Sequence, residues 1–212
     1  MEENKKRLLH HLKRQGYIRS QSVLEAMEAV KRELFVPEEL REFTYTDTPL
    51  PIGHGQTISA PHMVAMMCEL LQIERGDRIL EVGGGCGYHA AVLSRLTGEN
   101  GKVVSVEIVS QLVKVAISNL EKANIENVEM LQADGGLGHP GKGPYQRITV
   151  AAASPVIPKP LLDQLDEGGI MVIPVGKGGY QNLMVLKKRD KRIFEKDHGG
   201  VVFVPLKGKY GY

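Results

Sequence analysis

Acidic residues stand near the ends of three short apolar segments of the chain. Glu81 lies in RILEV just before a run of glycines, Glu107 ends KVVSVE, and Asp134 follows NVEMLQA. The carboxyl ends of parallel strands meet at one edge of a sheet, where ligands bind. A carboxylate after the second strand accepts hydrogen bonds from ribose hydroxyls there. An acid in the next loop, followed by Gly135, is suited to an adenine amino group. The three acids therefore predict a nucleoside-binding edge.

A glycine-rich loop, GGGCGY over residues 83–88, follows the first of these segments. Glycine lets a backbone turn sharply and approach a ligand closely, so we expect Gly83, Gly85 and Gly87 to contact a cofactor. The loop and the helix after it also fit a dinucleotide fingerprint, because Gly85, Gly87 and the alanine at position 90 have G-x-G-x-x-A spacing. Glu107 lies about 20 residues further on, as that fingerprint requires. An NAD-dependent dehydrogenase is thus one reading of this loop.

Glu81 distinguishes between the candidate cofactors. A dinucleotide would place its anionic pyrophosphate at the helix that begins after the glycines, where a nearby carboxylate would oppose it. S-adenosylmethionine has no phosphate and carries a sulfonium and an ammonium, which a carboxylate attracts. The acid therefore favours methyl transfer from S-adenosylmethionine over hydride transfer, with Glu81 among the cofactor contacts.

Alternating strand and helix patterns predict the fold that positions these residues. Apolar segments alternate with helical periodicity from residue 61, which indicates an α/β fold with a doubly wound, mostly parallel sheet. We expect a single methyltransferase domain over 1–212. It would comprise a helical N-terminal extension with a substrate loop (1–60), a cofactor-binding α/β core (61–177) and C-terminal strands that close the sheet and the cleft (178–212). The predicted strands are 78–82, 102–107, 127–131, 147–152 and 169–175, with helices at 61–71, 88–96, 110–123 and 158–165.

The ends of the chain give weaker patterns. A helix is expected over 3–15, closed by Gly16, and a second near Ser22, where Glu25 completes a capping box. Residues 45–59 are rich in Pro, Gly and Thr and predict a loop. After Gly178, LMVLKK and VVFVPL predict strands at one sheet edge, partly antiparallel.

Composition excludes several classes of function. The formal net charge of +2 is too balanced for dense phosphate contacts, so we expect no nucleic-acid partner. No apolar run approaches the roughly 20 residues that span a bilayer. Cys68 and Cys86 cannot form a secreted disulfide framework, and the first residues are charged. These features predict a soluble, cytoplasmic enzyme, and we also expect it to act as a monomer. We expect no metal, because the His and Cys residues show no paired ligand spacing.

The most specific string is GHGQTISAPHM, residues 53–63. It closely resembles a segment of the protein-L-isoaspartate O-methyltransferases, which repair damaged proteins that contain isoaspartyl residues. FVPEEL, YTDTPLPIG, LEVGGGCGYHAAVL, QLDEGGIMVIPVG and VVFVPLKG resemble further signatures of that family, in family order. The resemblance implies S-adenosylmethionine as methyl donor, S-adenosylhomocysteine as product, and isoaspartyl or D-aspartyl proteins as acceptors.

The same resemblance assigns individual residues. It places Ser59 in the active site, with Thr57 and Ile58 beside it along the substrate cleft, and Val204 in a segment that encloses the substrate peptide. It also assigns Glu107, Asp134 and Gly135 to the cofactor. Ser59 has a simpler alternative role, as N-cap of the helix that begins at Pro61.

The chemistry of the acceptor carboxyl group explains why the active site needs only one hydroxyl group to orient it. An isoaspartyl α-carboxyl has an ordinary pKa of about 3.5, so it is ionised at neutral pH and needs no general base. We expect Ser59 to orient it by a hydrogen bond, and His54 and His62 to have no role as bases.

Some positions depart from the family pattern. Gly84 and Cys86 replace two hydroxyl residues of the usual GTGSGY loop, and Gln146 replaces the acid of a PYD segment. If these changes abolish cofactor binding, a catalytically impaired binding homologue is the alternative. An S-adenosylmethionine enzyme for a small molecule or RNA is a second alternative, which the GHGQTISAPHM segment argues against.

Overall fold

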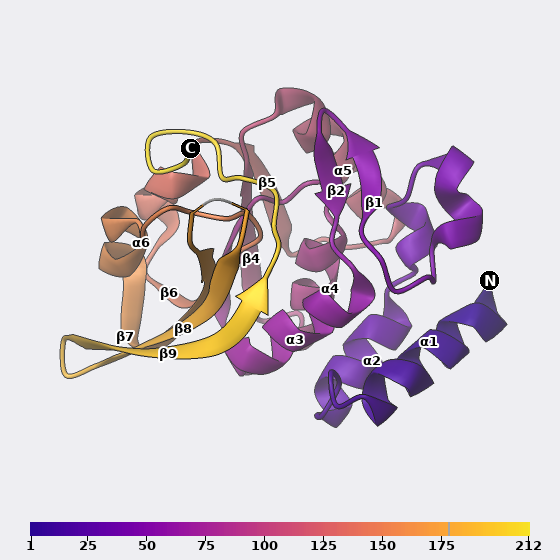
Figure 1. Cartoon of the computed structure of the whole chain (residues 1–212), viewed down its shortest axis with the longest axis horizontal. Coiled ribbons are helices and arrows are strands. Elements are labelled where there is room, and N and C mark those ends of the chain that lie inside the picture. The colour runs from indigo at the N-terminus through magenta and orange to yellow at the C-terminus, as the bar shows by residue number, and fades with distance from the viewer. Residues whose placement is uncertain (178) are drawn as a thin grey trace.

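The structure is a computed structural model that describes residues 1–177 and 179–212. A seven-stranded sheet forms its centre, with strand order β5-β4-β3-β6-β7-β8-β9. The first five strands in this order, from β5 to β7, run parallel to one another, while β8 and β9 are antiparallel additions at the edge next to β7. Figure 1 shows the helices on both sides of this sheet and the N-terminal helices at the far side from β9. The predicted doubly wound α/β fold is confirmed.

The core elements agree closely with the sequence pattern. The strands of the large sheet are β3 (Arg78–Val82), β4 (Lys102–Glu107), β5 (Val128–Gln132), β6 (Tyr145–Val150), β7 (Leu165–Val175), β8 (Gln181–Arg189) and β9 (Arg192–Val201). The helices that follow or precede them are α3 (Pro61–Leu71), α4 (Tyr88–Thr97), α5 (Ser110–Lys122) and α6 (Lys159–Gln164). Short 3-10 turns, η3 (Gly135–Leu137) and η4 (Pro140–Lys142), connect β5 to β6.

Two hydrophobic cores cover the two faces of the sheet. Side chains alternate along a strand, so Ile79 and Val103 face one layer while Leu80 and Val104 face the other. The first layer contains α3, α4 and α5 together with the N-terminal helices, and the second contains the shorter α6. Both layers are needed because parallel strands are buried on both faces.

The N-terminal extension consists of α1 (Glu2–Arg14), α2 (Gln21–Ala29) and the 3-10 turns η1 (Arg32–Leu34) and η2 (Glu38–Phe43). Its predicted capping box at Ser22 is wrong. Ser20 is the N-cap instead, because its hydroxyl accepts from the Val23 amide. Glu69 of α3 accepts hydrogen bonds from the Ser20 amide and hydroxyl, which joins this helix start to the core.

Two predictions for irregular segments are corrected. The expected loop 45–59 contains a hairpin of β1 (Leu50–Gly53) and β2 (Gln56–Ile58), whose turn has His54 at a φ of 54°. The expected strand VVFVPL is sheet only at its first residue, Val201, where β9 ends. The residues after Val201 are extended chain, with an isolated bridge from Pro205 to Ala153, and the edge strand lies earlier, at β9. β9 was not predicted because its sequence is rich in charged residues. Residue 178, at which the predicted C-terminal part of the domain (178–212) begins, lies outside the described residues.

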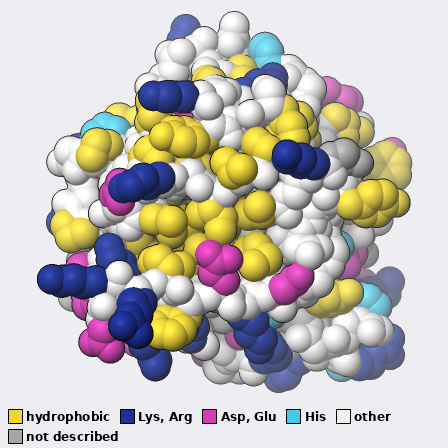
Figure 2. Space-filling model, turned by 60° about the vertical axis from the view of Figure 1, so that its left-hand side comes forward, with side chains coloured by type: hydrophobic (Ala, Val, Ile, Leu, Met, Phe, Trp, Pro, Cys, Tyr) yellow, Lys and Arg dark blue, Asp and Glu magenta, His cyan; other side chains and the backbone are white. Residues whose placement is uncertain are grey.

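The face that carries α6 has an apolar surface area. Figure 2 shows hydrophobic side chains gathered in the middle of this side, with Lys and Arg around them. Partly buried side chains from α6, β7 and β8, such as Leu162, Val175 and Met184, pack against the second core. No helix among the described residues is long and apolar enough to cross a membrane.

Candidate active site

A narrow cavity of about 50 Å³ lies at the carboxyl ends of the central strands. The strand order reverses between β3 and β6, and this switch point is where open α/β sheets bind ligands. The cavity is lined from the ends of β3, β4 and β6, from η3, from β2 and from the C-terminal segment. Its lining comprises Gln56, Thr57, Val82, Gly83, Gly85, Val106, Glu107, Ile108, Gly135, Ala151, Ala152, Val204, Pro205, Leu206 and Lys207.

The glycine loop has the backbone that its sequence predicts. Gly83, Gly85 and Gly87 have φ values of 87°, 53° and 88°, in the left-handed region that favours glycine. The amides of Gly83 and Gly84 both donate to the Val106 carbonyl, which fixes the loop against β4. Gly83 and Gly85 line the cavity, whereas Gly87 is the N-cap of α4 and its missing side chain makes room for α5.

Glu107 lies in the cavity wall with its carboxylate already oriented. One oxygen accepts from the Gly85 amide at 3.0 Å and the other from the Val109 amide at 2.9 Å. Each carboxylate oxygen has a second acceptor site, which leaves capacity for ligand hydroxyls. The bond to Gly85 joins the acid to the glycine loop, so these two predicted cofactor groups form one unit.

Asp134 and Gly135 follow β5. Gly135 lines the cavity, and a side chain there would come within 2.4 Å of Val82, so only glycine fits. Asp134 does not line the cavity. Its oxygens accept from the Gly136 amide at 3.0 Å and from the Lys209 amide at 2.8 Å, so it anchors the C-terminal segment beside the site.

Glu81 lies beneath the glycine loop and outside the cavity lining. Residue alternation along β3 turns its side chain into the helix layer, where it is fully buried and accepts a hydrogen bond from the Ser105 hydroxyl. Its other oxygen is 3.4 Å from Nδ1 of His89. Burial raises the pKa of Glu81 to about 8 and lowers the pKa of His89 to about 4, because each charged form loses hydration. Direct contact of Glu81 with a cofactor stays a prediction. Burial favours the neutral form of its carboxyl group, which weakens the charge attraction on which that prediction was based.

The departures from the family loop have local structural reasons. A side chain at Gly84 would lie 2.3 Å from the Ser105 hydroxyl and 2.9 Å from the end of Met130, so these two side chains fill the space. Cys86 is buried, and burial raises the pKa of its thiol to about 11, which agrees with a packing role.

Gln146 also has specific partners. Its side-chain oxygen accepts from the Arg78 amide at 2.8 Å, and its nitrogen donates to Asp166 at 2.9 Å. A carboxylate could not donate the second bond. The amide is therefore matched to its neighbours in this chain.

The substrate segment reaches the cavity through Thr57, while Val204 lines it from the C-terminal segment. Ile58 is buried in the first core and does not line the cavity. Ser59 is partly exposed between β2 and α3, and its hydroxyl forms no hydrogen bond with any described residue. It is not the N-cap of α3, because Ala60 holds that position without a side-chain bond.

Sequence reasoning missed several residues around this segment. Asp47 accepts from the His62 amide and from the His62 ring, both at 2.9 Å, and the ring packs on Tyr17 at 5.1 Å. His62 therefore fastens α3 to the extension. Ile108 follows the predicted acid Glu107 directly and lines the cavity, so its position was available as a signal. Arg32 was also missed; it is buried next to Ser59.

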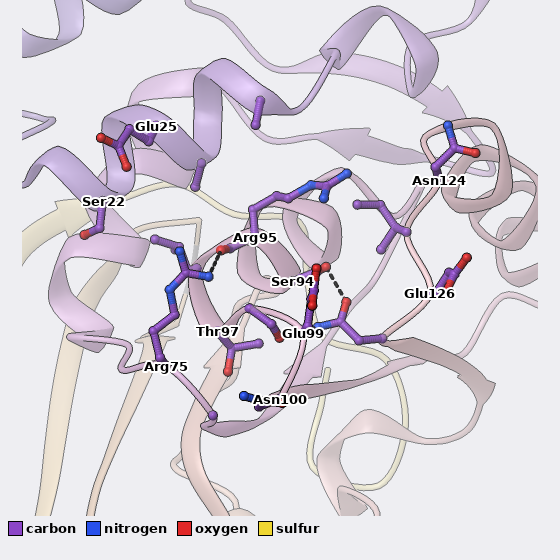
Figure 3. A pocket seen from close by; sticks show the side chains of 17 residues that line it. Ser22, Glu25, Arg75, Ser94, Arg95, Thr97, Glu99, Asn100, Asn124 and Glu126 are labelled. Atoms are coloured by element: carbon purple, nitrogen blue, oxygen red, sulfur yellow. Dashed lines mark hydrogen bonds between the residues drawn. The ribbon is translucent and has the colours of Figure 1, made fainter.

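Among the described residues, no group of three or more His, Cys, Asp or Glu side chains is arranged to hold a metal ion. A wide hollow of about 1050 Å³ lies at the opposite end of the sheet, before β3, β4 and β5, and Figure 3 shows Arg75, Arg95, Glu99 and Glu126 around it. It is remote from the glycine loop and does not belong to the predicted site.

The glycine loop after β3, the acid that ends β4 and a cavity at the switch point define the Rossmann-like class of nucleoside-binding α/β folds. The family model "Protein-L-isoaspartate(D-aspartate) O-methyltransferase (PCMT)" matches residues 3–211. The chain belongs to this family.

Similar proteins agree with that placement. A protein-L-isoaspartate O-methyltransferase of Methanothrix thermoacetophila is 56% identical over 208 residues, which cover 98% of this chain and 97% of the relative. One from Methanococcoides burtonii is 55% identical, with 91% and 95% covered. A solved protein-L-isoaspartate O-methyltransferase superposes with a TM-score of 0.89 at 31% identity, covering 98% of this chain and 67% of that one. A structure described as a putative protein-L-isoaspartate O-methyltransferase from Plasmodium falciparum, in complex with S-adenosyl-L-homocysteine, gives a TM-score of 0.85 at 30% identity, covering 95% of this chain and 97% of that one.

Proposed function

We propose that this protein transfers the methyl group of S-adenosylmethionine to the free α-carboxylate of L-isoaspartyl residues, and of D-aspartyl residues, in damaged proteins. The observation that carries the proposal is the unit formed by the glycine loop and Glu107 at the switch point, with the Thr57–Ser59 segment at its border. Family membership over residues 3–211 supplies the acceptor class.

The residues of the cavity suit an adenosine-containing cofactor. Gly83 and Gly85 bring backbone close to the cavity without side chains, and Gly135 does the same from the neighbouring strand end. Glu107 offers its free acceptor sites for ribose hydroxyls. S-adenosylmethionine, when bound, supplies a methyl group on a positively charged sulfur. Glu81 accepts a hydrogen bond from the Ser105 hydroxyl, which fills the space next to Gly84 of the loop, while its direct contact with the cofactor stays a prediction.

Ser59 orients the acceptor. The isoaspartyl carboxylate is already ionised at neutral pH, so the protein has to hold it rather than deprotonate it. The Ser59 hydroxyl has no hydrogen-bond partner among the described residues, so it is free to donate to a carboxylate oxygen. One neutral donor orients the anion without the strong stabilisation that a charged pair would give, and such stabilisation would slow attack.

The acceptor peptide is held by the segments on either side of the cavity. Thr57 and Val204 lie on opposite chain segments that both line it, and Ile58 fixes β2 to the core between Thr57 and Ser59. A peptide between these segments would exclude water from a reaction in which opposite charges are lost. Cytoplasmic location and a monomeric state remain predictions from the sequence.

The proposal is tested with labelled S-adenosylmethionine and two peptides that differ only in Asp or isoAsp at one position. Base-labile methyl ester should form on the isoaspartyl peptide alone. Equal labelling of both peptides, or no labelling under conditions where S-adenosylhomocysteine binds, would reject it. The second outcome would instead favour an impaired binding homologue.

A further inference from the structure

Arg32 is the largest fully buried side chain among the described residues, with 0% of its surface exposed. No carboxylate of the described residues lies within ion-pair distance of its guanidinium. Its Nη1 is buried without a hydrogen-bond partner. A buried charge is unfavourable unless it is paired, and an unpaired buried donor adds to that effect. The fold therefore keeps this group despite a loss of stability, which is typical of functional positions.

The partners of Arg32 lie around the proposed acceptor site. Its Nε donates to the Thr44 carbonyl at 3.0 Å, and its Nη2 donates to the Ser59 carbonyl at 2.9 Å. The guanidinium carbon lies 4.8 Å from the ring centroid of Tyr88, the residue with which α4 begins after the glycine loop. One planar group thus contacts the extension, the link that carries Ser59 and the helix behind the cofactor loop.

The position of Ser59 makes this contact important. Ser59 and Ala60 form the short link between β2 and α3, so neither element's own ladder fixes the Ser59 carbonyl. Rotation of the peptide after Ser59 would move its side chain relative to the cavity. Arg32 restrains that peptide by its hydrogen bond to the Ser59 carbonyl. Its contact with the Tyr88 ring also fixes the guanidinium relative to α4, which follows the cofactor loop.

We propose that Arg32 is a positioning residue for methyl transfer, which holds the Ser59 main chain so that the Ser59 hydroxyl faces the acceptor carboxylate. This inference rests on the proposed role of Ser59. The planar fork of the guanidinium carries the function, because a single ammonium cannot bond both carbonyls in one plane and stack on a ring.

Arg147 offers a matched control. It is also a buried arginine, 7% exposed, and its Nε and Nη2 both donate to the Gln72 carbonyl. Unlike Arg32 it has a carboxylate partner, Asp77 at 3.3 Å, and it lies away from the cavity lining. Loss of Arg147 should affect stability alone.

The test compares Arg32→Met, Arg32→Lys and Arg147→Met. We expect both Arg32 variants to lower kcat on an isoaspartyl peptide by about 10- to 100-fold, the range expected when a reacting group is misplaced. KM for the peptide should change less than kcat, and the Kd for S-adenosylhomocysteine should stay within about threefold, because the cavity wall is intact. Arg147→Met should retain the wild-type kcat at a temperature where it is folded. Wild-type kcat in folded Arg32→Lys would overturn the proposal, because it would show that charge alone suffices.

Amide hydrogen exchange supplies a readout that does not depend on activity. Exchange in the segment 57–60 should be faster in Arg32→Lys than in the wild type, and unchanged in Arg147→Met. Unchanged exchange in Arg32→Lys would overturn the restraint itself. An inactive wild-type protein whose exchange follows the expected pattern would reject the proposed function while the restraint by Arg32 stands.

Discussion

Glu81 should make the stability of the protein fall as pH rises through the neutral range. Its pKa of about 8 in the folded protein is above its ordinary value of 4.5. The folded state therefore holds a proton that the unfolded state releases, and this contribution to stability is lost as pH rises towards 8. The lowered pKa of His89, about 4, acts in the opposite sense but only below its ordinary value of 6.5. Between about pH 6.5 and about pH 8, Glu81 acts without that compensation.

The size of the effect follows from the pKa. One pKa unit corresponds to about 1.4 kcal/mol, so the free energy of unfolding should fall by about 2 kcal/mol over this range. For a chain of this length, the melting temperature should fall by about 4–8 °C. Glu81→Gln still accepts the hydrogen bond from Ser105 but cannot ionise, so it should remove this part of the pH dependence.

Urea unfolding at the two pH values measures the difference. Glu129→Gln is the control, because Glu129 is a carboxylate whose pKa is lowered by Lys142, so it stays ionised throughout this range. It should keep the wild-type pH dependence. If Glu81→Gln kept it as well, the burial argument for Glu81 would be refuted.

Three further predictions concern the loop, the amide position and the acceptor site. Gly84→Thr should destabilise the protein by about 1–3 kcal/mol through overpacking against Ser105. Thermal unfolding of the double variant with Ser105→Gly should recover part of that loss. No recovery would contradict the expected overlap between residue 84 and the Ser105 side chain. Gln146→Asp should cost about 1 kcal/mol in unfolding free energy, because the donor to Asp166 is lost and like charges approach, while kcat/KM stays near wild type. Ser59→Ala should lower kcat with calorimetric S-adenosylhomocysteine affinity nearly unchanged; lost binding with normal turnover per bound complex would show that its role is misassigned.

The central fold could be predicted because local and global signals agree there. The segments that became β3, β4 and β6 are short, apolar and separated by helical periodicity, so both period and burial indicated the same elements. β9 was missed because an edge strand is exposed and rich in charged residues, with Lys196 and Asp197 among them. The opposite error, a strand over the whole of VVFVPL, came from its β-branched residues: Val201 ends β9, whereas Val204 lines the cavity instead of pairing in the sheet.

The candidate site was predicted in part. Gly83, Gly85, Glu107 and Gly135 line the cavity because strand ends determine where they lie. Side chains alternate between the two faces of β3, and the sequence around Glu81 did not show which of those faces its side chain occupies. Arg32 could not be found from spacing, because its partners are backbone carbonyls that any sequence offers and that only the tertiary fold brings together.

The position of the transferred methyl group tests the central claim most directly. A peptide that contains one isoaspartyl residue, one glutamate and a free C-terminal carboxylate would be incubated with the protein and labelled S-adenosylmethionine, and the ester located by tandem mass spectrometry at mildly acidic pH. We predict the methyl group on the isoaspartyl α-carboxyl alone. A methyl ester on the glutamate or the C-terminus, or none on the isoaspartyl residue, would contradict the account.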